Sequence, residues 1–410
     1  MHDSCSAATR GMHPWPCCAA CKGQALPAWH TAREARVGAG IHAEHEARLN
    51  DAHERCARCS HAVFGGRSNA STMAQGGARR RAAALVRLLA PGCSAAAQQE
   101  AAHALARLCM RNSGNKDYVR EGGGIAALVR LLAPSGSAAV HEQAAAALAN
   151  LCWDNVKNKD SVRECGGIPA LLGLLAPGIS AAVQQTAALA LANLSADCGQ
   201  NKDSVRECGG APALVALLAL GNPAAVHENA ASALRALCRS SPQNRISVGQ
   251  CGGVAALVCL LAPGHSAAVQ GTAATALANI CCKNTQNQDC IRECGGVPAL
   301  VGLLAPGTCA AVQGDAASAL TNLCCCNSQN QDCIGECGGI PALVGLLARG
   351  VSPAVSEMAA TALTNICESH TKNQVCVKEC RGRAALIRLQ ARGGSLYLKD
   401  IAAKALHNLL

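Results

Sequence analysis

Two stretches of this 410-residue chain are almost the same: VRECGGIPALLGLLAPG at residues 162–178 and IRECGGVPALVGLLAPG at residues 291–307. The second or only glycine of each related stretch falls at 124, 167, 210, 253, 296, 339 and 382, so every step is 43 residues. The last copy has Arg381 in place of its first glycine, and ARRRAAALVRLLAPG at 78–92 keeps the register without the glycines. The chain therefore contains eight copies of one unit, of which the first and last are atypical.

The composition agrees with a stack of such units. Half of the residues are hydrophobic, yet there are only three Trp, two Tyr and one Phe. A core must therefore be built from Ala, Leu, Val and Cys, and these small side chains suit helices that pack closely.

The copy at 158–200 predicts the structure of one unit. Asn158 opens it, and its side-chain oxygen can cap a short first helix. Gly166 and Gly167 end that helix, because glycine adopts positive φ freely and allows a sharp turn. The column of Asn158 also holds Asn115, Asn201, Asn244, Asn287, Asn330 and Asn373.

Pro169 then predicts the first turn of a second helix, where its missing N–H costs nothing. Pro177 and Gly178 stop this helix, which we expect to be filled by Leu171, Leu172, Leu174 and Leu175.

A longer third helix is predicted from about Ser180 to Ser195. One buried stripe follows from the helical spacing of Val183, Ala187, Leu191 and Leu194.

This composite pattern resembles the armadillo family: an asparagine, a short helix, Gly-Gly, Ile/Val-Pro-Ala-Leu-Val-x-Leu-Leu, and a third helix that ends Ala-Leu-x-Asn-Leu. The resemblance covers about residues 82–410. It implies an all-α fold, a right-handed α-solenoid of about eight three-helix repeats, with residues 81–410 as the repeat domain.

A second asparagine column lies near the end of each third helix, with Arg107 and Ala236 in its two other positions. In the armadillo family this column lines the concave groove and binds the backbone of an extended peptide. An alternative stays open, in which these amides bond a neighbouring repeat, and both roles can hold together. The predicted peptide-binding residues are Asn150, Asn193, Asn279, Asn322 and Asn365, and Asn408 ends the column.

The groove departs from the importin-alpha branch, which pairs each groove asparagine with a tryptophan one turn earlier. This chain has Ala146, Leu189, Thr275, Ser318 and Thr361 at those positions. We expect a non-catalytic scaffold that binds a protein or an extended peptide. The alternative is an accessory or substrate-recruiting subunit of a ubiquitin-ligase-type assembly.

The net charge of +10 is divided between two regions. Residues 1–81 contribute +5 and the remaining 329 residues contribute +5. The repeats are thus close to balanced, and with six aromatic residues the chain does not favour nucleic acid as a partner. No apolar run is long enough for a membrane span. We expect a monomer in the cytoplasm or nucleus.

Twenty-eight cysteines raise the question of disulfides or metal. Equivalent residues of stacked helices lie roughly 8–10 Å apart, beyond the roughly 7 Å limit for a disulfide. We therefore expect small buried hydrophobic residues in a reducing compartment, with at least one thiol of Cys324, Cys325 and Cys326 facing solvent. The three columns are Cys165, Cys208, Cys251, Cys294, Cys337 and Cys380; Cys109, Cys152, Cys238, Cys281, Cys324 and Cys367; and Cys290, Cys333 and Cys376.

Residues 1–80 differ from the repeats, because they are rich in His, Arg and Ala. Two C-x₂-C pairs, Cys18 with Cys21 and Cys56 with Cys59, are compatible with zinc. Three interpretations stay open: disorder, a helix near residues 41–56 that covers the first repeat, or a zinc module that would serve the ligase alternative.

No catalytic constellation, cofactor motif or metal site is predicted in the repeats. His141, His227 and His265 fall near helix starts, where we expect them to be solvated.

Overall fold

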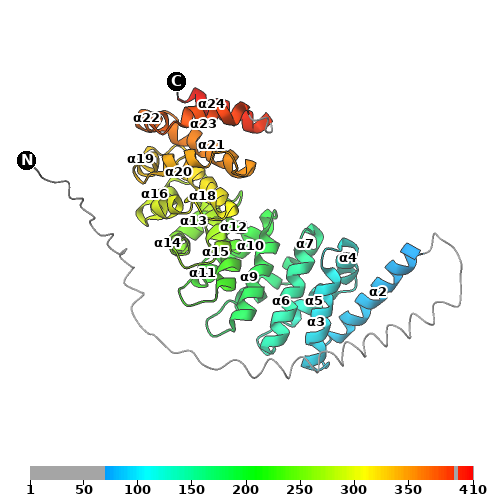
Figure 1. Ribbon diagram of the computed structural model, residues 1–410. Coiled ribbons are helices and arrows are strands. Elements are labelled where there is room, and N and C mark those ends of the chain that lie inside the picture. The colour runs from blue at the N-terminus through cyan, green and yellow to red at the C-terminus, as the bar shows by residue number, and fades with distance from the viewer. Residues whose placement is uncertain (1–69, 392–395, 410) are drawn as a thin grey trace, which may run out of the picture. The chain divides into compact units, whose positions relative to one another are not determined.

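A computed structural model describes residues 70–391 and 396–409 of the chain. These residues form 23 helices joined by turns. Figure 1 shows the helices following one another in chain order, and residues 75–410 form one compact unit. The predicted all-α stack with a period of 43 residues is confirmed.

Seven of the eight units have three helices, whereas the first copy has only a second-type helix, α2 (Ala70–Leu88), and a third helix, α3 (Ala95–Cys109). The first helices are α4 (Ser113–Glu121), α7 (Val156–Glu164), α10 (Gly199–Glu207), α13 (Pro242–Gln250), α16 (Thr285–Glu293), α19 (Ser328–Glu336) and α22 (Thr371–Glu379). The second helices are α5 (Gly124–Arg130), α8 (Gly167–Gly173), α11 (Gly210–Ala216), α14 (Gly253–Cys259), α17 (Gly296–Gly302), α20 (Gly339–Gly345) and α23 (Gly382–Ala391). The other third helices are α6 (Ala138–Cys152), α9 (Ala181–Ser195), α12 (Ala224–Cys238), α15 (Ala267–Cys281), α18 (Ala310–Leu323), α21 (Pro353–Cys367) and α24 (Leu396–His407).

The first helix of each repeat begins earlier than predicted. The N-cap of α7 is Asn155, whose side-chain oxygen accepts a hydrogen bond from the backbone N–H of Asn158 at 3.0 Å. The predicted capping role of Asn158 is therefore wrong, since this residue lies inside the first turn and is buried. Its Nδ2 donates instead to the carbonyl of Leu151 at 3.0 Å, and to that of Lys116 in the preceding repeat at 3.4 Å. The equivalent N-cap residues are Asn112, Cys198, Ser241, Asn284, Asn327 and His370.

The double glycine has two separate structural reasons. Gly166 has φ +74°, a left-handed conformation that side chains disfavour. Gly167 has no room for a side chain, because a Cβ there would lie 2.4 Å from Cγ1 of Val162 and 2.9 Å from its carbonyl oxygen. The first glycine therefore makes the turn, and the second lets two helices approach closely.

The second helix is shorter than predicted. Pro169 lies in the first turn of α8 as expected, but the helix ends at Gly173. Leu174 and Leu175 form a tighter turn beyond it, with N–H groups that donate to carbonyls three residues earlier, and both side chains are buried.

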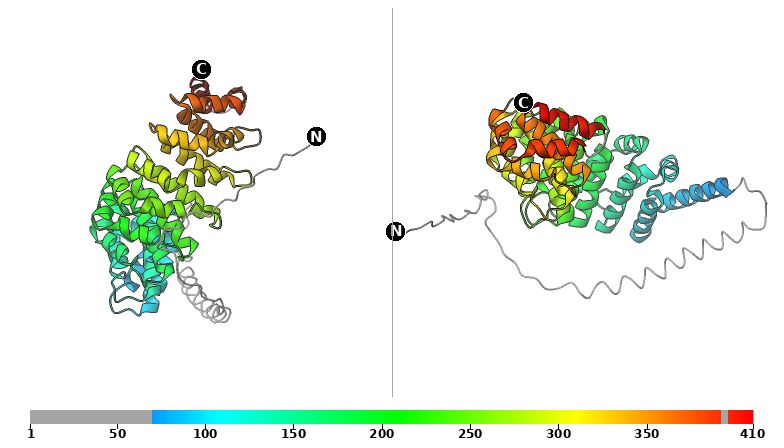
Figure 2. Two further views of the ribbon diagram at one scale, coloured as in Figure 1. Left: turned by 90° about the vertical axis from the view of Figure 1, so that its left-hand side faces the viewer. Right: turned by 45° about the horizontal axis from the view of Figure 1, so that its top comes forward.

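The third helices form the interior of the stack. The predicted stripe of α9 is confirmed, because Val183, Ala187, Leu191 and Leu194 are each at most 1% exposed. Third helices of consecutive repeats pack directly on one another. Figure 2 shows the stack of repeats from two further sides. Each fully buried leucine contributes roughly 1.5–3 kcal/mol, so every interface between repeats is held mainly by apolar burial.

The cysteine columns occupy different environments. The column that contains Cys152 is buried, as predicted, whereas the column of Cys165 and that of Cys290 are exposed or half-buried. The expectation of burial is wrong for these two columns, because Cys165 follows the end of a first helix at the surface. Cys324 is buried, whereas Cys325 and Cys326 are exposed, which confirms that thiols of this cluster face solvent.

Several predictions concern residues 1–69, which lie outside the described residues. They include the helix near 41–56 and the zinc module through Cys18, Cys21, Cys56 and Cys59. Helix α2 runs across the predicted boundary between residues 80 and 81. None of the described helices combines the length and the apolar character that a membrane crossing requires.

Candidate functional site

The third-helix face carries the predicted asparagines on α6, α9, α15, α18 and α21, and Asn408 directly follows α24. We call Asn150, Asn193, Asn279, Asn322, Asn365 and Asn408 the asparagine ladder. Each side-chain Nδ2 donates to the backbone carbonyl that lies 44 residues earlier, in the preceding third helix. The bonds reach Ala106 at 3.0 Å, Ala149 at 2.9 Å, Arg235 at 3.1 Å, Ala278 at 3.0 Å, Thr321 at 3.2 Å and Thr364 at 3.0 Å.

These bonds supply the structural role that the sequence left open. They do not use the whole amide, because an asparagine side chain has two N–H donors and one carbonyl acceptor. Each ladder amide makes one hydrogen bond within the described part of the chain, through one N–H. Asn193 is 9% exposed and the others are half-buried. The predicted role of the ladder in peptide binding stays a prediction.

A second set of side chains ties the first helix of a repeat to the end of the third helix of the same repeat. We call Lys116, Lys159, Lys202, Arg245, Gln288 and Gln331 the bridging column. Lys202 donates through Nζ to the carbonyl of Arg239, which follows α12. Gln288 and Gln331 donate to the carbonyls of the ladder residues Asn322 and Asn365, at 2.9 and 2.8 Å. The bridging column therefore fixes the backbone that presents the ladder.

Burial lowers the pKa of two lysines of this column, Lys116 and Lys202, below the usual lysine value. Carbonyls at a helix C-terminus carry partial negative charge, so cations are favoured there. The first three repeats with a complete first helix use lysine, and later repeats use Arg245 and then glutamine for the same contact.

The ladder is interrupted at Ala236. A hollow of about 90 Å³ lies there, lined by Ala196, Asp197, Arg235, Ala236, Arg239 and Asn279. Arg235 and Arg239 are exposed. Arg239 forms an ion pair with Asp197 at 3.7 Å. Burial raises the pKa of Asp315, and Arg235 partly opposes this increase. The missing asparagine thus leaves a small polar hollow with charges of both signs.

Two exposed apolar residues beside the ladder were not predicted from the sequence. Trp153 is 61% exposed and Met110 is 57% exposed, and each directly follows a third helix. A signal was available, because both lie in a column whose other members are mostly polar or small: Ala196, Arg239, Cys282, Cys325 and Glu368. Exposed tryptophan is enriched where proteins bind partners.

Two of the predicted solvated histidines are buried. Nε2 of His141 lies 2.8 Å from the carbonyl of Ala133, and Nε2 of His227 lies 3.0 Å from that of Ala219. The prediction is wrong for these residues, because the ring folds back onto the turn before its helix. His265 is half-buried, and burial followed by the neighbouring His227 lowers its pKa.

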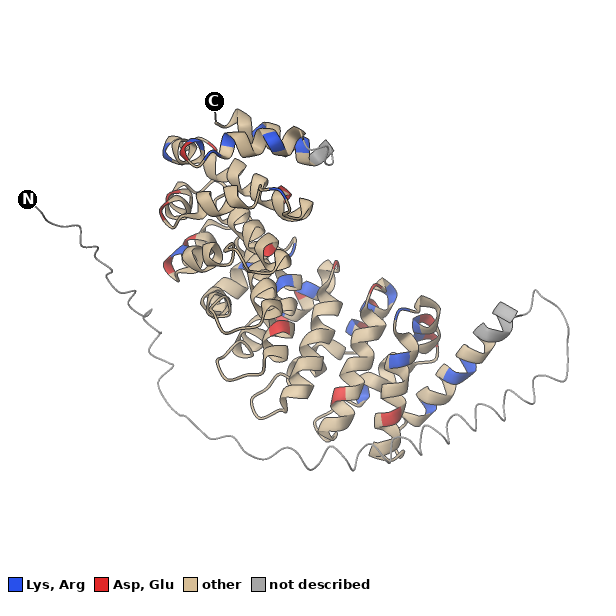
Figure 3. Cartoon of the chain, viewed as in Figure 1, with Lys and Arg blue, Asp and Glu red and all other residues tan. Residues whose placement is uncertain are grey.

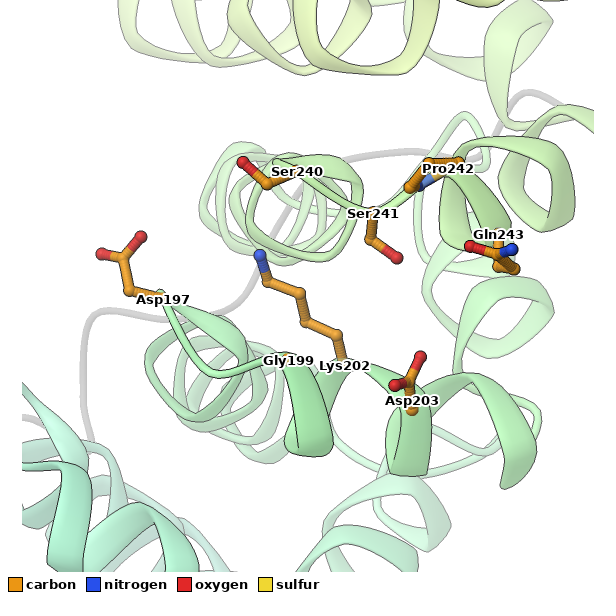
Figure 4. Close-up of a pocket in the computed structure, with 8 residues that line it drawn as sticks. All are labelled: Asp197, Gly199, Lys202, Asp203, Ser240, Ser241, Pro242 and Gln243. Carbon is orange, nitrogen blue, oxygen red and sulfur yellow. The ribbon is translucent and has the colours of Figure 1, made fainter.

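A larger open hollow of about 450 Å³ lies between the starts of α10 and α13. Figure 4 shows Lys202 between Asp197 and Asp203, with Ser240 and Ser241 across from it. The Lys202 ammonium is already bound to the carbonyl of Arg239. Among the described residues, no group of three or more His, Cys, Asp or Glu side chains could hold a metal ion.

Charges of both signs are distributed along the repeats (Figure 3). Four of the seven first helices, α4, α7, α10 and α16, repeat one local arrangement, in which an arginine lies near the aspartate three residues earlier and the glutamate directly after it. Arg206, for example, lies 3.5 Å from Asp203 and 3.2 Å from Glu207. Such exposed pairs contribute little to stability, typically below about 1 kcal/mol.

Solved structures with similar folds include engineered and designed proteins. The crystal structure of an engineered protein from the Northeast Structural Genomics Consortium is 32% identical with a TM-score of 0.73, and the match covers 80% of this chain and 78% of that one. The designed armadillo repeat protein YIII(Dq)4CqI is 24% identical with a TM-score of 0.55, covering 59% of this chain and all 100% of the other. A further designed armadillo repeat protein, solved in complex with the peptide (KR)4, is 23% identical with a TM-score of 0.54, covering 59% and 99%. No curated protein matches the chain.

The family model for the armadillo/beta-catenin-like repeat matches more than half of the chain. It matches six times, at residues 112–153, 155–196, 200–239, 241–282, 284–325 and 327–368. These ranges follow the observed repeats from α4 to α21. The repeated sequence, the stacked three-helix units and this match agree, and the chain belongs to the armadillo repeat family.

Proposed function

We propose that the third-helix face binds an extended peptide or a partner protein, and that the protein acts as a non-catalytic scaffold. The asparagine ladder carries this proposal. In each ladder residue one N–H is bound to the preceding repeat, so the amide is held in place. The remaining N–H and the carbonyl oxygen can then bind the main chain of a ligand at little further entropic cost.

The designed armadillo repeat protein in complex with (KR)4 supports this function for the fold. The present chain has Thr275, Ser318 and Thr361 one turn before its ladder residues, so it lacks aromatic slots for lysine stems. We therefore do not expect a preference for basic peptides. The ladder amides bind the main chain of the peptide, and the exposed Trp153 and Met110 offer apolar contacts beside them.

The abundance of cysteines supports a reducing compartment, cytoplasm or nucleus, and the proposal includes a monomer. The alternative ligase-associated function depends on a zinc module that lies outside the described residues.

The first test removes the ladder where it is continuous. The variant Asn279→Ala, Asn322→Ala, Asn365→Ala is used beside wild type to select 12-residue peptides from a displayed random library, and affinities of selected peptides are then measured by fluorescence anisotropy. Each lost hydrogen bond contributes about 0.5–1.5 kcal/mol, so we expect the triple variant to bind at least tenfold more weakly.

A matched control removes three exposed amides from first helices, in the variant Gln243→Ala, Gln286→Ala, Gln329→Ala, and should bind as wild type. A second variant, Ser318→Arg, leaves the ladder bonds intact but places bulk on the same face, so it blocks binding without weakening the stack. The proposal is rejected if the triple ladder variant and the Ser318→Arg variant are both folded and bind peptides as tightly as wild type does.

A further inference from the structure

Three consecutive first helices each carry a cysteine in the helix and a second cysteine four residues later, at the C-cap position. The pairs are Cys290 with Cys294, Cys333 with Cys337, and Cys376 with Cys380. Residues four apart on a helix lie on the same face. In each pair the backbone N–H of the second cysteine donates to the carbonyl of the first, at 2.9, 3.0 and 3.0 Å, so the helical geometry extends to the second cysteine and the two thiols are neighbours on one face.

These thiols are accessible from solvent. Cys294 is exposed, and the other five are half-buried. The three helices α16, α19 and α22 pack on one another and lie one above another at the left edge of Figure 1. The pairs therefore form a row at the surface of the first-helix side, away from the asparagine ladder.

Earlier repeats provide a natural comparison. Their equivalent positions hold Ser161 with Cys165, Ser204 with Cys208, and Ser247 with Cys251. The same helix geometry thus presents one thiol in three repeats and two thiols in the next three. The paired arrangement is a feature of these C-terminal repeats that the peptide-binding function does not use.

Burial, with a smaller contribution from neighbouring groups, raises the pKa of one thiol in each pair. Burial, then the partner thiol and the adjacent Glu293, raises the pKa of Cys294 to about 11. Burial and Cys337 likewise raise the pKa of Cys333 to about 11, although Arg292 opposes the increase. Cys376 has a raised pKa through burial, Cys380 and Glu379. Such thiols are poor nucleophiles, so a ligand must be one that displaces the protons.

The number of sulfur ligands selects the kind of metal. Zinc in structural sites takes four ligands, and the described residues contain no group of three or more metal-binding side chains. Thiolates are soft ligands that favour Cu(I), and Cu(I) accepts two sulfur ligands in a linear arrangement. We propose that each of the three cysteine pairs binds one Cu(I) ion between its two sulfur atoms.

Binding involves no oxidation or reduction. One Cu(I) ion and two thiols give a bis-thiolate complex and release two protons, so the metal stays Cu(I) and the net charge of the site changes by −1. Because binding releases two protons, the apparent affinity for Cu(I) increases with pH, by up to about a hundredfold for each unit, as long as the pH is below the thiol pKa values.

The test compares two variants that each lack three thiols. The pair variant is Cys290→Ser, Cys333→Ser, Cys376→Ser, which installs the residue found in the earlier repeats. The control variant is Cys165→Ser, Cys208→Ser, Cys251→Ser, which removes unpaired thiols. The reduced full-length proteins are titrated without oxygen with Cu(I) in competition with bathocuproine disulfonate, and circular dichroism checks the fold.

We expect the pair variant to retain three fewer Cu(I) ions than wild type, and the control variant to retain the same number as wild type. All other cysteines, including the adjacent Cys325 and Cys326, are common to the three proteins and cancel in the comparison. The proposal is overturned if the pair variant retains all of its copper, or if the control variant loses as many ions. The proteins are also titrated with Zn(II) in place of Cu(I). If the pair variant alone binds fewer Zn(II) ions than wild type, the two-coordinate assignment is overturned.

Discussion

Arg381 adopts φ +59°, at the position where the other complete repeats have glycine. A left-handed conformation costs a non-glycine residue roughly 1–2 kcal/mol, part of which is offset because glycine loses more entropy on folding. We expect Arg381→Gly to raise the free energy of unfolding by about 0.5–1 kcal/mol, measured by urea denaturation. Gly338→Ala is the reciprocal variant, since Gly338 has φ +76° and open space for a Cβ, and it should lower stability. If the Arg381→Gly protein is no more stable than wild type, Arg381 is not strained in its left-handed conformation.

The asparagines of the repeats show which features the sequence does not predict. Asn158 and Asn155 have the same side chain, and both amides can cap a helix or bond a carbonyl, so chemistry alone does not decide which of them is the cap. The register of the helix decides it, and the sequence leaves that register uncertain by a few residues. Asn193 is the opposite case, because its column was located correctly, but its bond to Ala149 depends on how far consecutive repeats are offset.

At the scale of elements, the bridging column joins each first helix to the next third helix. Lys202 is buried and its bond to the Arg239 carbonyl is partly shielded from water, so a lost bond leaves a partly buried acceptor unpaired. We expect Lys202→Met to lower the free energy of unfolding by about 1–3 kcal/mol. Lys202→Gln should cost less than half of that, because Gln288 and Gln331 make the same contact in later repeats. Thermal denaturation of both variants checks this prediction. Equal losses of stability in the two variants would show that a hydrogen-bond donor at position 202 does not contribute to stability.

The elements themselves were predictable to different extents. The third helices were predicted well, because their apolar stripe repeats at helical spacing over 15 residues in α9. The second helices were predicted too long, since Leu174 and Leu175 are buried in a turn as completely as they would be in a helix. Burial of a cysteine column also depends on which helix face meets a neighbour, and this is why the column of Cys165 was misplaced at the core.

The molecule as a whole is a chain of interfaces between neighbours. Repeats contact the units before and after them, so stability behaves as a sum of repeat and interface contributions, and a defect should spread only to adjacent units. Sequence periodicity predicts this architecture directly, whereas it does not reveal what the third-helix face binds. A local defect placed in one repeat can therefore measure how far the coupling reaches.

Gly296 is suited to this measurement because it lies at a junction of two repeats. A Cβ there would lie 2.5 Å from Cγ2 of Ile291, 2.8 Å from its carbonyl oxygen and 3.0 Å from Cγ2 of Val258. Overpacking of this kind costs about 1–3 kcal/mol, so Gly296→Ala should speed amide hydrogen exchange roughly tenfold or more in α16 and α17 and in their neighbours α14 and α19. Exchange in α5 to α8 should be unchanged. Gly302→Ala, which meets nothing within 4 Å at the end of the same helix α17, serves as the control and should leave every rate near wild type. Uniform acceleration across all repeats in Gly296→Ala would instead show that the stack unfolds as one cooperative unit, and the nearest-neighbour description would fail.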